Sequence, residues 1–235
     1  MRAIAAVVAL AASLAAATPV LAQAYQCRAP RSIGPVPQVR PDGPPRRTAI
    51  AGYVLAASWS PEYCRNGRDA ATMQCSGANG RFGFVLHGLW PEARSGPPPQ
   101  WCSLTPAPSP DLVRRTLCMT PVPWLIAHEW AKHGSCMAKR PEDYYRVSGI
   151  LWRSLAWPDA DRLSRKRDLT AGDLRSAFAE ANPDWRPEQV GVLVSRTGWL
   201  REIKLCYDRK FMPTRCDRGS FGPPDSQALK IWRGL

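Results

Sequence analysis

Residues Phe84–Pro91 read FVLHGLWP, an apolar run that contains one histidine, His87, and then meets a glycine and a proline. The chain of 235 residues has only two other histidines, and both lie in the segment His128–Cys136, which reads HEWAKHGSC. The first run predicts a buried strand over residues 81–87, which Gly88 and the following proline end. Because all the histidines lie in two short segments, we expect these segments to meet in one site.

The second histidine segment predicts a functional face on a helix. The apolar and aromatic pattern from Trp124 to His133 favours a helix that stops at Gly134. At about 100° per residue, four polar side chains fall within an arc of roughly 140°, namely those of His128, Glu129, Lys132 and His133. Trp130 points away from this arc and is expected to anchor the helix in the core.

Two imidazoles that face each other suit phosphodiester cleavage without a metal ion. One histidine takes a proton from the attacking hydroxyl and the other gives a proton to the leaving oxygen, and both roles need a pKa near the working pH. A neighbouring cation and a hydrogen-bonding carboxylate then stabilise the charged phosphorane. A zinc protease would need HExxH, with its histidines four residues apart. Here they are five apart and Lys132 adds positive charge, so we reject that chemistry.

The N-terminal segment predicts export to the periplasm or the medium. Arg2 precedes an Ala/Val/Leu run that ends in small residues, which is typical of a signal peptide over residues 1–24. A retained membrane helix is disfavoured because no basic stop-transfer flank follows. Eight cysteines lie beyond this segment, and their even number predicts four disulfides: Cys27, Cys64, Cys75, Cys102, Cys118, Cys136, Cys206 and Cys216. A zinc site is the weaker interpretation, since no CxxC pair occurs.

The charge of the chain suggests a polyanionic partner. The formal net charge is +13, and the basic residues are spread along the sequence. Such a balance attracts nucleic acid, polyphosphate or an anionic membrane surface, and charge alone does not choose among them.

The remaining pattern predicts an α+β domain over residues 49–235, because strands lie early and late with helices between them. Residues 25–48 are rich in Pro, Gly and Arg and predict a mobile arm or loop ahead of it. Further predicted segments are a strand over 49–59, a disulfide-pinned loop over 61–80, a long proline-rich loop over 91–123, helices over 141–155 and 170–181, and strands over 190–194 and 199–207.

The two histidine segments resemble the signature segments of the ribonuclease T2 family of secreted, base-unspecific endoribonucleases. The HGLWP core is intact, and the second segment follows the pattern HEWxKHGxC at every fixed position. Trp59–Cys64 resembles an early element of the family, and Glu202–Cys206 resembles its late strand. The resemblance runs from about Tyr53 to Cys216 and is sharp only in the two motifs.

The resemblance implies a single-domain α+β ribonuclease fold, with helices packed on a central antiparallel sheet and with disulfides as staples. It also implies a two-step reaction on single-stranded RNA that needs no metal and no cofactor and passes through a 2′,3′-cyclic phosphate. Carried over by position, His133 is the general base and His87 the general acid, although the two exchange roles between the steps. Glu129 and Lys132 stabilise the pentacovalent state, and His128 binds the phosphate.

Base contacts carry over less directly. Trp90 matches a family tryptophan that stacks on a base, although it could also be a core residue. Glu92 stands where the family usually has Asp, so its longer arm could shift the base preference or leave the contact unmade. Trp124 could line a second base site, but we expect core packing there.

The cysteine pairing is also a matter of resemblance, because eight cysteines allow 105 connectivities. The family favours Cys102–Cys136 and Cys206–Cys216. Cys64–Cys75 is a plausible local pair, and Cys27–Cys118 remains.

Two other classes of function stay open. One is an RNA-binding relative that has kept the fold and lost catalysis, although binding does not need paired imidazoles. The other is a metal-dependent nuclease, which would need clustered carboxylates that are not found near the histidines. We expect a monomer that is not inserted in a membrane and that uses RNA as its substrate.

Overall fold

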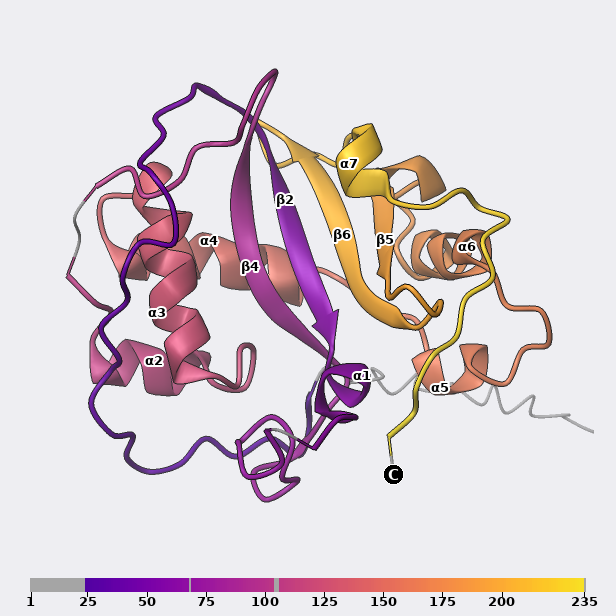
Figure 1. Ribbon diagram of the computed structural model, residues 1–235, viewed down its shortest axis with the longest axis horizontal. Coiled ribbons are helices and arrows are strands. Elements are labelled where there is room, and N and C mark those ends of the chain that lie inside the picture. The colour runs from indigo at the N-terminus through magenta and orange to yellow at the C-terminus, as the bar shows by residue number, and fades with distance from the viewer. Residues whose placement is uncertain (1–23, 68, 104–105, 235) are drawn as a thin grey trace, which may run out of the picture.

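A twisted four-stranded antiparallel sheet forms the centre of the computed structural model, which describes residues 24–67, 69–103 and 106–234 (Figure 1). The strands lie in the order β4-β2-β6-β5, with β2 at Ile50–Trp59, β4 at Phe84–Ala93, β5 at Val190–Val194 and β6 at Leu200–Asp208. A short ladder pairs β1 (Ala24–Tyr25) with β3 (Arg81–Phe82). The predicted signal peptide, residues 1–24, lies outside the described residues apart from Ala24.

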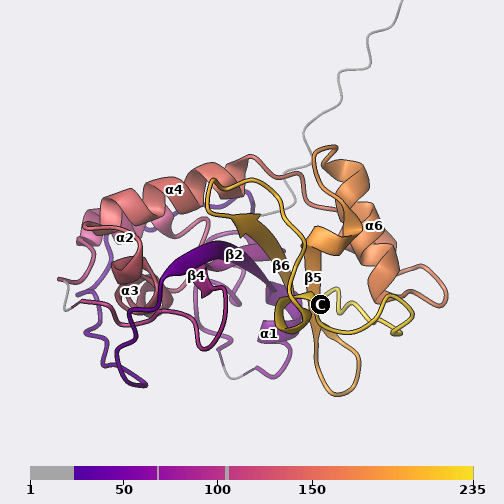
Figure 2. The same ribbon diagram turned by 90° about the horizontal axis from the view of Figure 1, so that it is seen from above.

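The helices gather at the two edges of the sheet and along one of its sides. Figure 2 shows α4 and α6 on the same side of the strands, with α3 beyond β4. The bounds are α1 Ser60–Cys64, α2 Pro110–Thr116, α3 Pro123–Lys132, α4 Pro141–Arg153, α5 Ala160–Leu163, α6 Ala171–Ala181 and α7 Arg218–Phe221, with 3-10 turns at Gly134–Cys136 and Pro187–Gln189. None of the helices in the described part of the chain is long and apolar enough to span a membrane.

Local sequence signals explain where these helices begin. The predicted capping box opens α6, since the Thr170 hydroxyl accepts the Asp173 N–H and the Asp173 carboxylate accepts the Thr170 N–H. α4 starts with Pro141, whose missing N–H costs nothing at the first helical position. Helix α2 lies inside the segment that we expected to be a loop, where Ser109 caps its first turn. That expectation was wrong because α2 spans only two turns, too few to show a clear apolar period.

The two faces of the sheet have different side chains. The main core takes alternate residues of the central strand β2, namely Leu55, Ala57 and Trp59, all buried. The opposite face of β2 presents Gly52, Val54, Ala56 and Ser58, which are small or short. Residues that pair across neighbouring strands point to the same face of the sheet. Strand β4 therefore adds Trp90 and Glu92 to this second face, and β6 adds Glu202, Lys204 and Cys206. The short residues of β2 thus lie between Trp90 and Glu92 on one strand and Glu202 and Lys204 on the other.

Strand β4 continues through Gly88 and Pro91, contrary to the prediction that they end it. Pro91 pairs with Tyr53 of β2 and is tolerated because β4 is an edge strand of this sheet. A register shift falls where Ala56 faces Gly88 and Ala57 faces Leu86, so that His87 is the extra residue of a β-bulge.

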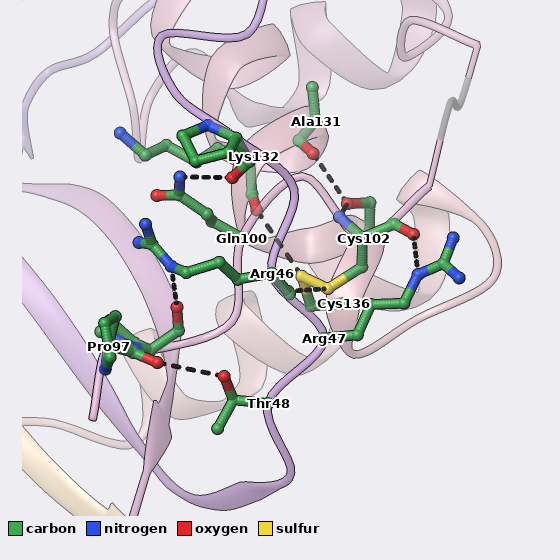
Figure 3. The surroundings of a disulfide bond; sticks show 12 residues. Arg46, Arg47, Thr48, Pro97, Gln100, Cys102, Ala131, Lys132 and Cys136 are labelled. Carbon is green, nitrogen blue, oxygen red and sulfur yellow. Dashed lines mark hydrogen bonds between the residues drawn. A yellow bond between two sulfur atoms is a disulfide. The ribbon is translucent and has the colours of Figure 1, made fainter. Parts of the chain in front are cut away.

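The predicted N-terminal arm has no helix or strand beyond Tyr25 of β1, but it is fastened to the domain. Arg46 and Gln100 exchange backbone hydrogen bonds, and the Arg47 side chain donates to the Cys102 carbonyl at 3.0 Å. Figure 3 shows the Arg47 contact beside the Cys102–Cys136 disulfide, next to Lys132 of α3. The structure forms four disulfides, which are the four suggested pairs: Cys27–Cys118, Cys64–Cys75, Cys102–Cys136 and Cys206–Cys216.

Candidate active site

Three neighbouring strands bring one hydrogen-bonded group to the small-residue face of the sheet. His87 Nδ1 lies 2.5 Å from Oε1 of Glu202, and the Ser58 hydroxyl donates to the same oxygen at 2.9 Å. Glu202 is buried, whereas the side chain of His87 is about one third exposed. The bulge in β4 is the reason for this contact, since regular alternation would put His87 and Gly88 on opposite faces.

Helix α3 supplies a second carboxylate on the other side of the same imidazole. Glu129 is buried, with Oε1 3.6 Å from His87 Nε2, and its Oε2 accepts the Trp90 indole N–H at 2.7 Å. A Cβ at Gly88 would lie 2.0 Å from Glu129 Oε2, so only glycine lets the carboxylate approach the strand this closely. The glycine of the HGLWP segment therefore makes room for the glutamate of the HEWAKHGSC segment.

Trp90 lies beside both imidazoles. Its ring centroid is 5.2 Å from that of His87 and 5.6 Å from that of His133. His133 follows the last residue of α3, and its backbone N–H still bonds to Glu129. Among the described residues, Nδ1 of His133 has no hydrogen-bond partner. The two histidines therefore have different surroundings. Carboxylates flank His87, whereas no carboxylate of the described residues bonds to His133.

The other polar residues of α3 are held by aromatic rings and by the arm. His128 stacks on Trp124, with ring centroids 4.8 Å apart, and meets the edge of Trp101. The ammonium group of Lys132 bonds to Asp42 of the arm at 2.7 Å. The other oxygen of that carboxylate accepts the Trp101 indole N–H at 3.0 Å. The arm thus places a carboxylate against the cation of the predicted site.

These surroundings shift the protonation of the two histidines in opposite directions. Burial works to lower the pKa of His87, but the hydrogen bond to Glu202 and the charge of Glu129 outweigh it, so the net pKa is raised. Burial, together with the charge of Lys132, lowers the pKa of His133 to about 3. Burial also lowers the pKa of His128, with Lys132 adding to the effect. At neutral pH, His133 is a neutral acceptor, while His87 retains its proton more readily than a free histidine.

The carboxylates of the site are also separated in pKa. Burial raises the pKa of Glu129 to about 7. Burial acts in the same sense on Glu202, but its hydrogen bond with His87 dominates and lowers its pKa. Glu92 lies further along the same face, and burial together with the charge of Asp217 raises its pKa to about 7.

A cleft of about 960 Å³ opens beside His87 and Glu202. Its walls include Trp124 of α3 and, on the other side, the basic side chains of Arg196 and Arg201. Trp124 is 49% exposed, so the expectation of core packing there was wrong. It lies one turn before His128 on the polar face of α3, and an apolar residue on that face is not directed to the core.

Four of the predicted site residues therefore form one contact group, which consists of His87, Trp90, Glu129 and His133. Lys132 and His128 follow on the same helix, and Glu92 lies farther along β4. Sequence reasoning missed Ser58, Glu202, Lys204 and Asp42. Lys204 Nζ lies 5.5 Å from the Trp90 ring, on the same sheet face. For strand β6, the available signal was the charged pair Glu202 and Lys204 at alternate positions. In the described residues, no group of three or more His, Cys, Asp or Glu side chains is arranged to hold a metal ion.

Comparison with known proteins agrees with this arrangement. The sequence model of the Ribonuclease T2 family matches residues 51–157. The chain is 31% identical over 163 residues to a protein named ribonuclease from Aeromonas hydrophila, covering 67% of this chain and 72% of that one. It is 30% identical over 177 residues to a probable ribonuclease of Haemophilus influenzae, covering 70% of this chain but only 60% of the relative.

A solved structure, that of the S-like ribonuclease trichomaglin, has the same fold. It superposes with a TM-score of 0.60 and 21% sequence identity, covering 77% of this chain and 98% of that one. With both signature segments in one contact group and with these relatives, the chain belongs to the ribonuclease T2 family.

Proposed function

We propose that the protein is an endoribonuclease that cleaves single-stranded RNA by metal-independent transphosphorylation with little base specificity. The observation that supports this most strongly is the asymmetry of the two imidazoles beside Trp90. Glu202 and Glu129 favour the protonated form of His87, whereas burial and Lys132 favour the neutral form of His133. One group is therefore ready to give a proton and the other to accept one at the same pH.

In the first step, neutral His133 takes the proton of the 2′-hydroxyl as its oxygen attacks the neighbouring phosphorus. The bond from phosphorus to the 5′ oxygen breaks, and His87 gives its proton to that leaving oxygen. The products are a 2′,3′-cyclic phosphate and a free 5′-hydroxyl. In the second step, His87 takes a proton from water as the water oxygen attacks phosphorus. The bond from phosphorus to the 2′ oxygen breaks, His133 returns a proton to that oxygen, and a 3′-phosphate results.

The charge that develops on the phosphorane needs donors held in place before the reaction. Lys132 supplies a cation, and Glu129, with a pKa of about 7, is partly protonated at neutral pH and can donate a hydrogen bond. His128 is expected to bind the phosphate. Trp90 offers a ring surface to a base, and stacking tolerates any base, which fits low specificity. Glu92 is expected to contact the edge of that base.

The test is RNA cleavage by the oxidised protein in excess EDTA, with product ends identified by mass spectrometry. We expect cyclic phosphate ends, no cleavage of a substrate that lacks the 2′-hydroxyl at the scissile position, and a loss of about 100- to 10,000-fold in turnover for His87→Ala or His133→Ala. Cleavage only after metal is restored would indicate a metallonuclease. RNA binding that survives both substitutions without any cleavage would indicate a binding protein.

We also infer that the protein works in the periplasm or outside the cell. Four disulfides persist in oxidising compartments, and the first 24 residues have the composition of a signal peptide. Fractionation of the native host should recover the active protein without residues 1–24. Recovery of the full chain from the cytosol would contradict this inference.

A further inference from the structure

A cluster of cations and indole rings lies where the C-terminal segment meets α1, outside the candidate active site. The Arg65 guanidinium lies 4.3 Å from the ring centroid of Trp199 and 4.7 Å from that of Trp232. The two rings meet edge to face, 5.9 Å apart, and Lys230 Nζ lies 5.6 Å from the Trp199 ring. Two cations therefore share one aromatic support, which we call the Arg65 cluster.

The backbone holds this cluster in place. The Trp59 indole N–H donates to the Trp232 carbonyl at 2.6 Å. Lys230 accepts the N–H of Leu200 and donates its own to Gly198, each at 2.8 Å. The C-terminal segment thus runs beside the β5–β6 hairpin, which fixes the backbone of Lys230 and Trp232 next to Trp199.

The cations of the cluster are poorly neutralised. Within the described residues, Arg65 has one carboxylate in reach, that of Glu62 at 3.5 Å, and Lys230 forms no ion pair. Two hollows of about 520 and 540 Å³ flank the cluster, and both are lined by Trp232 and Arg233. The positive groups consequently border space that a ligand can enter.

The hollows lead toward the candidate active site. Gln74 lines both the 540 Å³ hollow and the cleft that contains His87. Glu62 of α1 lines that cleft and contacts Arg65, while Arg196 and Arg201 project from the β5–β6 hairpin on its far wall. Arg201 is the extra residue of a second bulge, between the pairs Leu193–Glu202 and Val194–Leu200. The Arg65 cluster therefore adjoins the cleft of the reacting centre, with Gln74 and Glu62 at the junction.

We propose that the Arg65 cluster is a second RNA-binding site, which holds the phosphates of single-stranded RNA at a distance from the scissile bond. Cations placed against aromatic rings, beside hollows whose charged side chains are mainly basic, are what sequence-independent binding of single strands requires. The inference rests on the proposed function, because a long strand that enters the cleft is what the cluster would retain. It makes the enzyme favour long strands over short ones.

The test compares the wild type with the double variant Arg65→Ala/Lys230→Ala on two ligands. The first is a dinucleotide, which fills only the reacting centre. The second is a 30-nucleotide single strand, used as RNA for cleavage and as its non-cleavable 2′-deoxy form for fluorescence anisotropy. Arg140→Ala/Arg146→Ala removes the same charge from two exposed residues, one just before α4 and one within it, and serves as the matched control.

We expect dinucleotide turnover to stay within about twofold, while KM and Kd for the 30-mer rise about 5- to 10-fold at 0.1 M salt. The slope of log Kd against log salt should fall by about 1.4, since each phosphate contact on a single strand contributes about 0.7. Equal Kd and slope for the cluster variant and the wild type would overturn the proposal. An equal rise in Kd for the control variant Arg140→Ala/Arg146→Ala would also overturn it. The same holds if the cluster variant loses binding to anionic vesicles but keeps its binding to the 30-mer.

Failure of this site and failure of the proposed function give different results. A wild type that does not cleave even the dinucleotide contradicts the function, and the 2′-deoxy binding data still decide on the cluster. Thermal unfolding of each variant shows whether it is folded. If the double variant unfolds, the single changes Arg65→Gln and Lys230→Gln, which keep side-chain length, take its place.

Discussion

Replacing Glu202 by Gln removes the buried charge that holds the proton on His87 while keeping the size of the side chain. The contact at 2.5 Å is a hydrogen bond between charged groups, which is worth about 1.5 to 3 kcal/mol. Without it, only the charge of Glu129 still opposes the effect of burial, and the pKa of His87 falls. Since 1.36 kcal/mol corresponds to one pKa unit, the pKa of His87 falls by about one to two units. Above the pKa of His87 in the wild type, the fraction of protein with protonated His87 is therefore about 10- to 100-fold smaller in the variant.

The assay is kcat/KM for a dinucleotide from pH 4 to pH 9. We expect the variant to match the wild type at the acid end, where His87 is protonated in both proteins, and to fall about 10- to 100-fold below it on the alkaline side. Asp69→Asn, which removes a carboxylate from the same cleft without a contact to His87, should leave the profile unchanged. A variant profile that is lowered equally at every pH would refute the reasoning, because Glu202 would then act on structure and not on the proton.

The pair also affects stability, and the sign follows from the two shifts. The raised pKa of His87 stabilises the fold below the pKa of an unfolded histidine, and this stabilisation is lost as pH rises through the folded value. The lowered pKa of Glu202 stabilises the fold above the pKa of an unfolded glutamate and is lost in acid. Urea unfolding should therefore show the largest difference between variant and wild type at weakly acid pH, between these limits.

Three further predictions follow from the geometry. Gly88→Ala should lower kcat by about 100-fold or more, because its Cβ would displace the Glu129 carboxylate. Steady-state kinetics, with thermal unfolding as a check of the fold, would show this. A near-normal kcat would contradict the assigned place of Glu129. Replacing Cys102 and Cys136 together by Ser opens a loop of 34 residues. By the chain-entropy relation this should lower the free energy of unfolding by about 4 kcal/mol, which urea unfolding would measure. A loss below about 1 kcal/mol would mean that other contacts close the loop. The pKa of about 3 for His133 predicts that RNA cleavage persists in acid, and a steep loss below pH 6 would show that another base acts.

Much of the fold follows from local signals in the sequence. Thr170 and Asp173 define the start of α6 within one turn, and the proline at position 141 does the same for α4. The strand over residues 49–59 is a continuous apolar run, as expected for the central position that β2 occupies. These features depend on residues close together in the chain, which is why the sequence alone predicts them.

The details that make the site depend on pairing between distant strands. Nothing in FVLHGLWP shows that Leu86 and His87 avoid strict alternation, because the bulge exists only relative to β2. For the same reason the sequence did not show that Glu202 bonds to His87, since the two residues lie 115 positions apart. Asp42 reached Lys132 from a segment whose composition predicted only a mobile arm. The motifs indicated which groups react, and the strand register decides which groups control their protons.

The order of the disulfides along the chain constrains how the protein can mature. Cys27–Cys118 and Cys102–Cys136 interleave, because the second bridge starts inside the loop of the first and ends outside it. A chain that emerges from its N-terminus and oxidises cysteines in the order of their appearance would join Cys27 to Cys64 instead. The native pairs then require thiol–disulfide exchange after residue 136 has emerged. Production in a compartment with disulfide isomerase activity should therefore give more active protein than production under oxidation alone.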